Sequence, residues 1–118
     1  MHIRNLTPHH IKLINQSTGE EVVLPPDPNG PARCVVSRVQ VDQLLIRGVT
    51  IPIVKTIFGD VYNLPATVHG TRFIVSRPVA EALAGIRRDL LVPENLVRDE
   101  QGRIIGAGAL AIYEPRER

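Results

Sequence analysis

The chain of 118 residues contains few aromatic residues, one cysteine and no long apolar run. With two Phe, two Tyr and no Trp, its core must consist mainly of Val, Ile, Leu and Ala. The single cysteine, Cys34, excludes an intramolecular disulfide. No segment approaches the roughly 20 apolar residues of a membrane-spanning helix, and the opening MHIRNLTPHH has no stretch that resembles a signal peptide. We therefore expect a cytoplasmic protein without a membrane partner.

Lysine is also scarce, because twelve of the 14 basic residues are Arg. The formal net charge of +2 is too small to predict nucleic-acid binding from electrostatics. Arg does bind phosphates and carboxylates with two parallel hydrogen bonds, which a Lys side chain cannot do. An excess of Arg over Lys is equally typical of a GC-rich genome. The composition therefore argues against a nucleic-acid partner and leaves a small anionic ligand open.

Aliphatic and β-branched residues favour strands, and the chain is rich in them. Residues 3–6 predict a short strand before a Thr-Pro break. Residues 10–14 and 21–24 predict two more strands on either side of the turn sequence NQSTG, which gives an N-terminal hairpin within residues 1–24. The following PPDPNGP, residues 25–31, has four Pro and one Gly and predicts a stiff loop.

Two heptapeptides, ARCVVSR at 32–38 and TRFIVSR at 71–77, share four of seven residues. Each contains an apolar run typical of an interior strand, followed by a Ser-Arg pair. The matching can be extended in both segments with a gap. We therefore predict two β-α-β-β units, 32–64 and 71–107, as an internal duplication. Chance similarity of a common strand-to-helix sequence is the alternative.

Each Ser-Arg pair precedes a stretch that is compatible with a helix. Ser37 and Gln40 match a capping box, and apolar residues follow at helical spacing within 41–45. Ser76 can cap a second helix, with Pro78 in its first turn. We predict an α+β fold in a single domain, 1–118, with a mixed or mainly antiparallel sheet and two short helices. A mostly β fold is the alternative if these helices shrink to single turns.

No sequence motif for catalysis or metal binding stands out. His9-His10 would point to opposite faces of a strand, and neither HExxH nor CxxC is present, so we expect no metal site and no cofactor. Cys34 lies in an apolar run, and no Gly-x-Ser-x-Gly surrounds Ser37 or Ser76. GAG at 106–108 lacks the frame of a phosphate-binding loop and indicates a bulge or bend. The sequence therefore favours a binding protein over an enzyme.

The best candidate ligand site lies at the two predicted strand-to-helix junctions. Helix N-termini attract anions, and a neighbouring Arg can bind a phosphate with two hydrogen bonds. Two such ends would suit a nucleotide-like ligand with two phosphates. Pairing of these Arg side chains with surface carboxylates is the alternative. The predicted ligand-binding residues are Arg33, Ser37, Arg38, Arg72, Ser76 and Arg77.

The opening IRNLTPH resembles the start of small, mostly uncharacterised proteins of bacteriophages and bacterial genomes. GTRFIVSRPVAEAL, RRDLLVP and VRDEQGRIIGAGAL are also similar to segments of such proteins. The resemblance implies a phage or prophage protein located in the host cytoplasm, and it transfers no catalytic residue. It draws notice to Asn5, Thr7 and His9, for which we favour a turn that locks the first strand.

Three functions follow as hypotheses. The first is a non-enzymatic binding protein of phage type that binds or sequesters a small anionic, nucleotide-like ligand. The alternative is a structural or interaction protein that acts through a protein partner, and it predicts an exposed apolar patch or sheet edge. The third is a small hydrolase, which would need a His and an acid beside one Ser or Cys. A homo-oligomer is among the expected assemblies.

Overall fold

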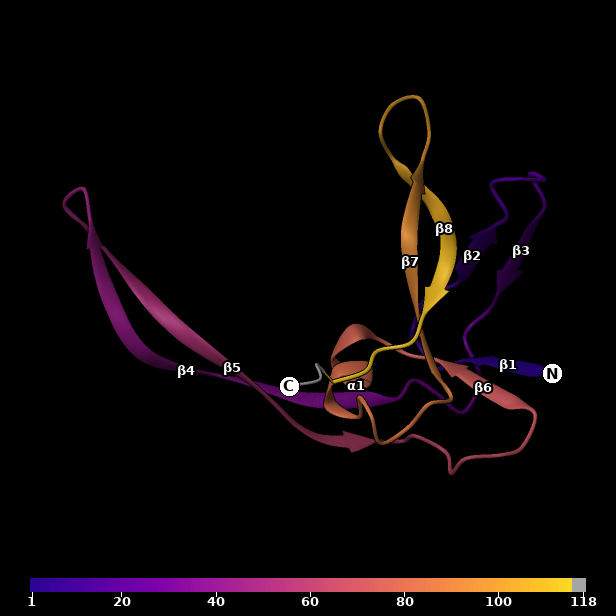
Figure 1. Cartoon of the computed structure of the whole chain (residues 1–118), viewed down its shortest axis with the longest axis horizontal. Coiled ribbons are helices and arrows are strands. Elements are labelled where there is room, and N and C mark those ends of the chain that lie inside the picture. The colour runs from indigo at the N-terminus through magenta and orange to yellow at the C-terminus, as the bar shows by residue number, and fades with distance from the viewer. Residues whose placement is uncertain (116–118) are drawn as a thin grey trace.

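A computed structural model describes residues 1–115 and shows a mostly β protein (Figure 1). One mixed sheet has the strand order β1-β6-β7-β8-β2-β3, and two longer strands, β4 and β5, form a separate hairpin. One short helix, α1, follows β6. The elements are β1 (His2–Asn5), β2 (Ile11–Ile14), β3 (Glu21–Leu24), β4 (Arg33–Ile46), β5 (Val49–Tyr62), β6 (Thr71–Ile74), α1 (Arg77–Ala82), β7 (Leu90–Arg98) and β8 (Ile104–Ala111).

The six-stranded sheet combines parallel and antiparallel pairs. β1 pairs with β6, β6 with β7 and β2 with β8 in parallel, whereas β2–β3 and β7–β8 are antiparallel. The loop after β3 then returns to the end of β1. There the Asp27 amide donates to the Asn5 carbonyl at 2.8 Å, and Asn5 Nδ2 donates to the Leu24 carbonyl at 3.0 Å. These bonds connect the two edges, so the sheet is nearly closed.

The core lies where β1, β6 and β7 meet α1. Phe73 and Ile74 at the end of β6, and Val75 directly after it, are all fully buried, and β6 lies between two parallel neighbours in the sheet. Partly buried Cys34 and Val61, from the base of β4 and β5, pack against this core. The buried residues of the cluster are Leu6, Ala32, Phe73, Val75, Val79, Ala80, Leu90 and Val92.

The predicted α+β fold with two helices is wrong, and the mostly β alternative describes the structure. Ser37 and residues 41–45 lie in the middle of β4 rather than in a helix. The reason is a two-residue turn that the helical interpretation did not consider. Arg47 and Gly48 have φ angles of 48° and 82°, which suit the tight turns that join antiparallel strands. This turn returns β5 onto β4, so the segment gains cross-strand pairs in place of helical hydrogen bonds.

The predicted duplication is also wrong as a β-α-β-β repeat. Residues 32–64 form the β4–β5 hairpin, whereas 71–107 run through β6, α1 and β7 into β8. The two similar heptapeptides already differ in structure within their shared letters, because Val36 and Ser37 lie in β4, whereas β6 ends at Ile74 and α1 begins at Arg77. Pro78 lies in the first turn of α1 and cannot donate to a strand ladder, whereas Val39 continues β4. The residues that follow the repeated letters therefore favour different structures.

The β4–β5 hairpin projects away from the core, and we call it the arm (Figure 1). The radius of gyration is 17.5 Å, whereas a compact domain of this length has about 13.5 Å. The β7–β8 and β2–β3 hairpins project in another direction, and the principal extents are 52 × 40 × 33 Å. In residues 1–115 no helix is long and apolar enough to cross a membrane.

The GAG run of 106–108 lies within β8, where β2 approaches closely. A Cβ on Gly106 would lie 2.9 Å from the Lys12 carbonyl oxygen, and one on Gly108 would lie 2.7 Å from Gln16 Oε1. The irregularity in the ladder is beside this run, where the β7 register shifts between Val97 and Arg98. The two glycines therefore permit close strand packing, and they form no ligand loop.

Candidate protein-interaction surface

The arm is a ladder of only two strands along its whole length. Its register runs from Arg33 opposite Tyr62 at the base to Ile46 opposite Val49 at the tip. Two shifts interrupt this register, and the outer one lies between Gln40 and Asp42. No third strand pairs with either outer edge of the arm within residues 1–115. Both edges therefore present backbone groups that a further strand could bind.

Side chains alternate between the two faces of a strand, so the register assigns the paired residues between Ser37 and Ile57 to one face or the other. One face, which we call the apolar face, has aliphatic residues at most positions. The other face mixes apolar side chains with the polar ones of Arg38, Gln40, Gln43, Thr50 and Thr56. The apolar face comprises Val39, Leu44, Ile46, Val49, Ile51, Ile53 and Ile57, together with Ser37, Asp42 and Lys55.

The seven aliphatic residues of the apolar face are between 37% and 57% exposed. Two-stranded hairpins are only marginally stable when nothing covers them, and soluble monomers rarely expose contiguous apolar patches of this kind. The aliphatic residues of the core, by contrast, are almost completely buried. The apolar face therefore has the composition of a protein interior, but no other part of residues 1–115 covers it.

Two opposite charges lie in the middle of the apolar face. Lys55 is opposite Val39, and Asp42 is opposite Ile53 in the next pair along the face. Asp42 Oδ1 accepts a hydrogen bond from the Gln43 amide at 2.7 Å. Within residues 1–115 no ion pair joins Asp42 to Lys55. The face is thus apolar, elongated and electrically neutral as a whole.

The structure separates the predicted ligand-binding residues into two groups. Arg33, Ser37 and Arg38 lie on β4, and Ser37 and Arg38 point to opposite faces of the arm. The second group, Arg72, Ser76 and Arg77, lies at β6 and the start of α1. No hydrogen bond or ion pair joins the groups in the part of the chain that the structure describes. The prediction of two helix N-termini is wrong, because only the second helix forms.

Arg77, the first residue of α1, is held by structural contacts. Its Nε donates to the Tyr113 hydroxyl at 2.8 Å, and that hydroxyl donates to Glu94 at 2.8 Å. The hydrogen bond to Tyr113 is the main cause that raises the pKa of Arg77, and Glu81 and Glu94 add to it. Ser76 makes no side-chain capping bond. The carboxylates of Glu81 and Glu94 each lie 3.9 Å from the Arg77 guanidinium, which is the pairing with surface carboxylates that the alternative described.

The Asn-Leu-Thr-Pro-His motif locks the end of β1. Asn5 is 3% exposed, and its Nδ2 donates to the His9 carbonyl at 2.7 Å and to the Leu24 carbonyl at 3.0 Å. Its Oδ1 accepts from the Thr7 amide at 3.0 Å and from the Thr7 hydroxyl at 2.7 Å. His9 takes part through its backbone. The motif is thus a hydrogen-bonded turn in which the Asn5 side chain is fully used.

Two ion pairs stabilise the body of the protein. Arg87 donates to both carboxylate oxygens of Asp89, at 2.8 and 2.7 Å, and this hydrogen bonding lowers the pKa of Asp89. Arg4 binds Asp27 at 2.7 Å, and the same cause lowers the pKa of Asp27. Both guanidinium groups also lie over the Phe73 ring, at 5.5 Å for Arg4 and 6.0 Å for Arg87. These charges are engaged in the fold and are not free for a ligand.

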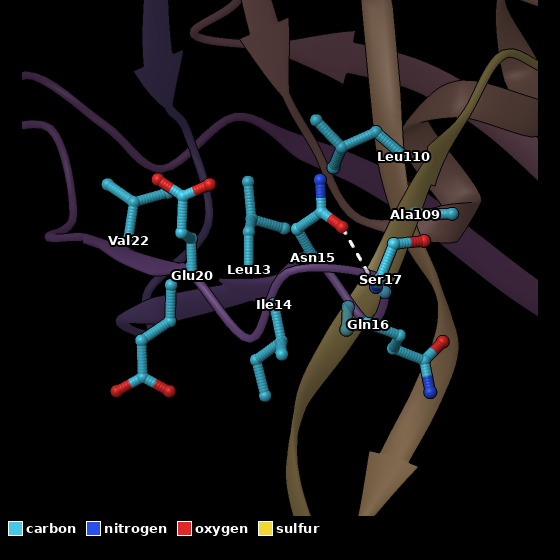
Figure 2. A pocket seen from close by; sticks show the side chains of 12 residues that line it. Leu13, Ile14, Asn15, Gln16, Ser17, Glu20, Val22, Ala109 and Leu110 are labelled. Carbon is cyan, nitrogen blue, oxygen red and sulfur yellow. Dashed lines mark hydrogen bonds between the residues drawn. The ribbon is translucent and has the colours of Figure 1, made fainter.

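A groove of about 710 Å³ lies between the β2–β3 hairpin and β8 (Figure 2). Asn15 Oδ1 accepts from the Ser17 amide at 3.0 Å, so this side chain shapes the turn. Asn95 Nδ2 donates to Gln16 Oε1 at 3.1 Å. Glu20 and Glu21 are the acidic groups of the lining, and Glu21 pairs with Lys12 at 3.2 Å. The charged side chains that line this groove are therefore acidic.

A second groove, of about 590 Å³, contains His69, Arg72 and Arg88. Arg72 is a predicted ligand-binding residue that lines this second groove, whereas none of the six predicted residues lines the first. Arg88 is highly exposed and lies 3.7 Å from Glu114. Within residues 1–115, no group of three or more His, Cys, Asp or Glu residues is placed to hold a metal ion. Cys34 Sγ lies near the carbonyl of Gly59, at 3.7 Å.

Comparison with models of protein families, with curated proteins and with solved structures finds no match to this chain. The most unusual feature of the structure is the arm. Sequence reasoning missed this surface. The signal that could have found it is the Arg47-Gly48 pair between two long β-branched runs, which is the pattern of a hairpin with a two-residue turn.

Proposed function

We propose that this is an interaction protein that acts through a protein partner, and that the apolar face of the arm is its contact surface. The observation that carries the proposal is the row of seven aliphatic side chains, 37–57% exposed, on a hairpin outside the core. This is the exposed apolar patch that the interaction hypothesis predicted. The unpaired edges of the arm add a second feature of the same prediction.

The free energy available from burying these side chains supports the proposal that a partner covers the apolar face. Burying the exposed half of a Val, Leu or Ile side chain contributes about 1 kcal/mol, so the seven together contribute on the order of 7 kcal/mol. Folded domains are stable by only about 5–15 kcal/mol in total. The free energy gained by covering the apolar face is therefore comparable to the stability of the whole domain. The entropic cost of association reduces this gain.

The shape of the arm favours a protein over a small molecule. A 14-residue strand spans about 45 Å, and the apolar residues are distributed over most of that length. Small-molecule sites are concave and enclose most of the ligand surface, whereas the face of a two-stranded ribbon is open. A second layer of protein at the usual sheet-to-sheet distance of about 10 Å could cover the whole row at once.

Site-specific photocrosslinking in the producing cells tests this proposal. A photoreactive residue replaces Ile51, which lies on the apolar face, or Thr50, which lies on the opposite face and is the matched control. We expect crosslinking to a protein from position 51 and much less from position 50. Equal crosslinking from both faces, or none from position 51, would contradict the assignment of the contact surface.

A further inference from the structure

We propose that the partner is a second copy of this chain, and that two arms pack with their apolar faces together about a two-fold axis. This inference rests on the proposed function and identifies its partner. A two-fold contact uses the same surface twice, so that surface must be complementary to itself. The apolar face meets this requirement in both its packing and its charge.

The charge pattern is the specific argument for a second copy. Lys55 and Asp42 are the two charged residues of the apolar face, one of each sign, in adjacent pairs near its middle. A partner that offered only an apolar surface would bury both charges without compensation, which is costly. A second copy supplies one carboxylate and one ammonium group at the same place. Each charge then meets its opposite across the interface.

The register shows how the charges can meet. A two-fold axis parallel to the arm places β4 of one copy over β5 of the other. Lys55 of the second copy then lies over Val39, because Val39 is the cross-strand neighbour of Lys55 within each chain. Asp42 is in the next pair along β4 on the same face. A Lys side chain reaches across one such step, so two equivalent Asp42–Lys55 contacts form.

The arm forms a small interface in this assembly. Only the ten residues of the apolar face contact the other copy, compared with the roughly 20–30 residues that a standard interface takes from each partner. Packed apolar faces of two hairpins form a small sandwich, in which sheets align within about 30°. The seven aliphatic residues of each copy form its interior, and the mixed face remains toward solvent. Each marginal hairpin thereby obtains the second layer that it lacks.

Ile53→Asp and Val54→Asp form a matched pair of variants that tests the assembly. The two residues are consecutive aliphatic positions on β5 and point to opposite faces. By light scattering and sedimentation at roughly 100 μM, well above a micromolar Kd, we expect twice the 13.0 kDa chain mass for the wild type and Val54→Asp. We expect the single-chain mass for Ile53→Asp. Circular dichroism checks that both variants fold, which we expect because neither residue belongs to the core.

A charge exchange tests the register. Asp42→Lys and Lys55→Asp should each raise the dimer Kd by about tenfold or more, because each places like charges together. The double variant Asp42→Lys/Lys55→Asp should return to within about threefold of the wild type. Double-variant binding no tighter than that of the single variants would overturn the proposed contact. A monomeric wild type, an assembly of more than two copies, or a dimer that Val54→Asp breaks and Ile53→Asp leaves intact would overturn the two-fold packing.

These outcomes separate the two proposals. If position 51 crosslinks to a different protein while the purified chain is monomeric, the arm remains the contact surface and the second-copy inference fails. If position 51 crosslinks to nothing and the chain is monomeric, both fail. If the crosslinked product has twice the chain mass and Ile53→Asp abolishes it, both are supported.

Discussion

The body and the arm use the same aliphatic residues in opposite ways. In the body, Phe73, Ile74 and Val75 are 0% exposed, and the polar groups at the end of β1 are satisfied by a single buried side chain, Asn5. In the arm, Ile51 and Val49 remain 43% and 57% exposed on a ladder of two strands. The comparison teaches that composition alone does not separate core from interface. The topology decides which apolar segments the chain can cover itself.

The largest expected difference between the two regions concerns their phenylalanines. Phe73→Ala should lower the free energy of unfolding by about 3–5 kcal/mol, because it leaves a cavity in the core. Phe58→Ala, on the mixed face of the arm and 39% exposed, should lower it by about 1 kcal/mol or less. Urea denaturation at one fixed protein concentration measures both values. Similar losses would show that the arm folds as part of the core, contrary to the comparison.

A smaller effect is expected for buried polar groups. Asn5→Ala should lower the free energy of unfolding by about 2–3 kcal/mol, because the carbonyls of His9 and Leu24 lose their donor in a buried site. Gln40→Ala on the exposed mixed face of the arm is the control and should change stability by about 0.5 kcal/mol or less. Thermal and urea unfolding provide the comparison. A neutral Asn5→Ala would mean that water replaces the side chain and that the motif does not lock β1.

The smallest effect concerns acid. The Asp89 carboxylate has a lowered pKa in the folded protein because it accepts hydrogen bonds from Arg87. Its contribution to stability is therefore complete above the unfolded pKa of about 4 and is lost as the pH falls through the lower folded pKa. Asp89→Asn should remove this dependence, which is on the order of 1 kcal/mol. Urea midpoints between pH 2 and 7 test it, and an unchanged acid limb in the variant would contradict the role of this pair.

Local patterns in the sequence predicted several elements of the body. The alternation on either side of NQSTG marked the strands that became β2 and β3, and the apolar run before Ser76 with Pro78 marked β6 and α1. These elements depend on neighbours within a few residues, so short windows contain the necessary information. The parallel pairing of β1 with β6, which joins residues about 70 positions apart, has no such local signal.

The arm was harder to predict because its pattern changes phase. On β4 the apolar-face residues are Val39 and then Leu44 and Ile46, since the register shift between Gln40 and Asp42 moves the alternation by one residue. The same shift brings apolar residues to spacings that fit a helix. On β5, the apolar residues Val54 and Phe58 lie on the mixed face, so apolar and polar residues do not alternate regularly along this strand. Only the pairing of the two strands shows which side chains share a face.

The predicted ligand site depended on the same error. Its premise was a pair of helix N-termini, and the first of these required residues 37–46 to be helical. Arg38 instead has Thr56 as its cross-strand neighbour. Helix N-termini do attract anions. The Arg47-Gly48 turn, however, keeps the residues before it in β4, so the first of the two helices does not form. The site could therefore be no more accurate than the secondary structure beneath it.

Because the arm ends in a two-residue turn, its length is fixed by the number of residue pairs in the β4–β5 ladder. Its strands leave and rejoin the body at Arg33 and Tyr62, which are cross-strand neighbours, so the distance from body to tip is set only by the number of residue pairs between them. Adding one pair beyond the base would turn every outer side chain to the other face, whereas adding two pairs would restore the faces and extend the reach by about 7 Å. An arm that keeps its apolar face on the same side can therefore lengthen or shorten only by an even number of residue pairs. The body need not change when the arm does.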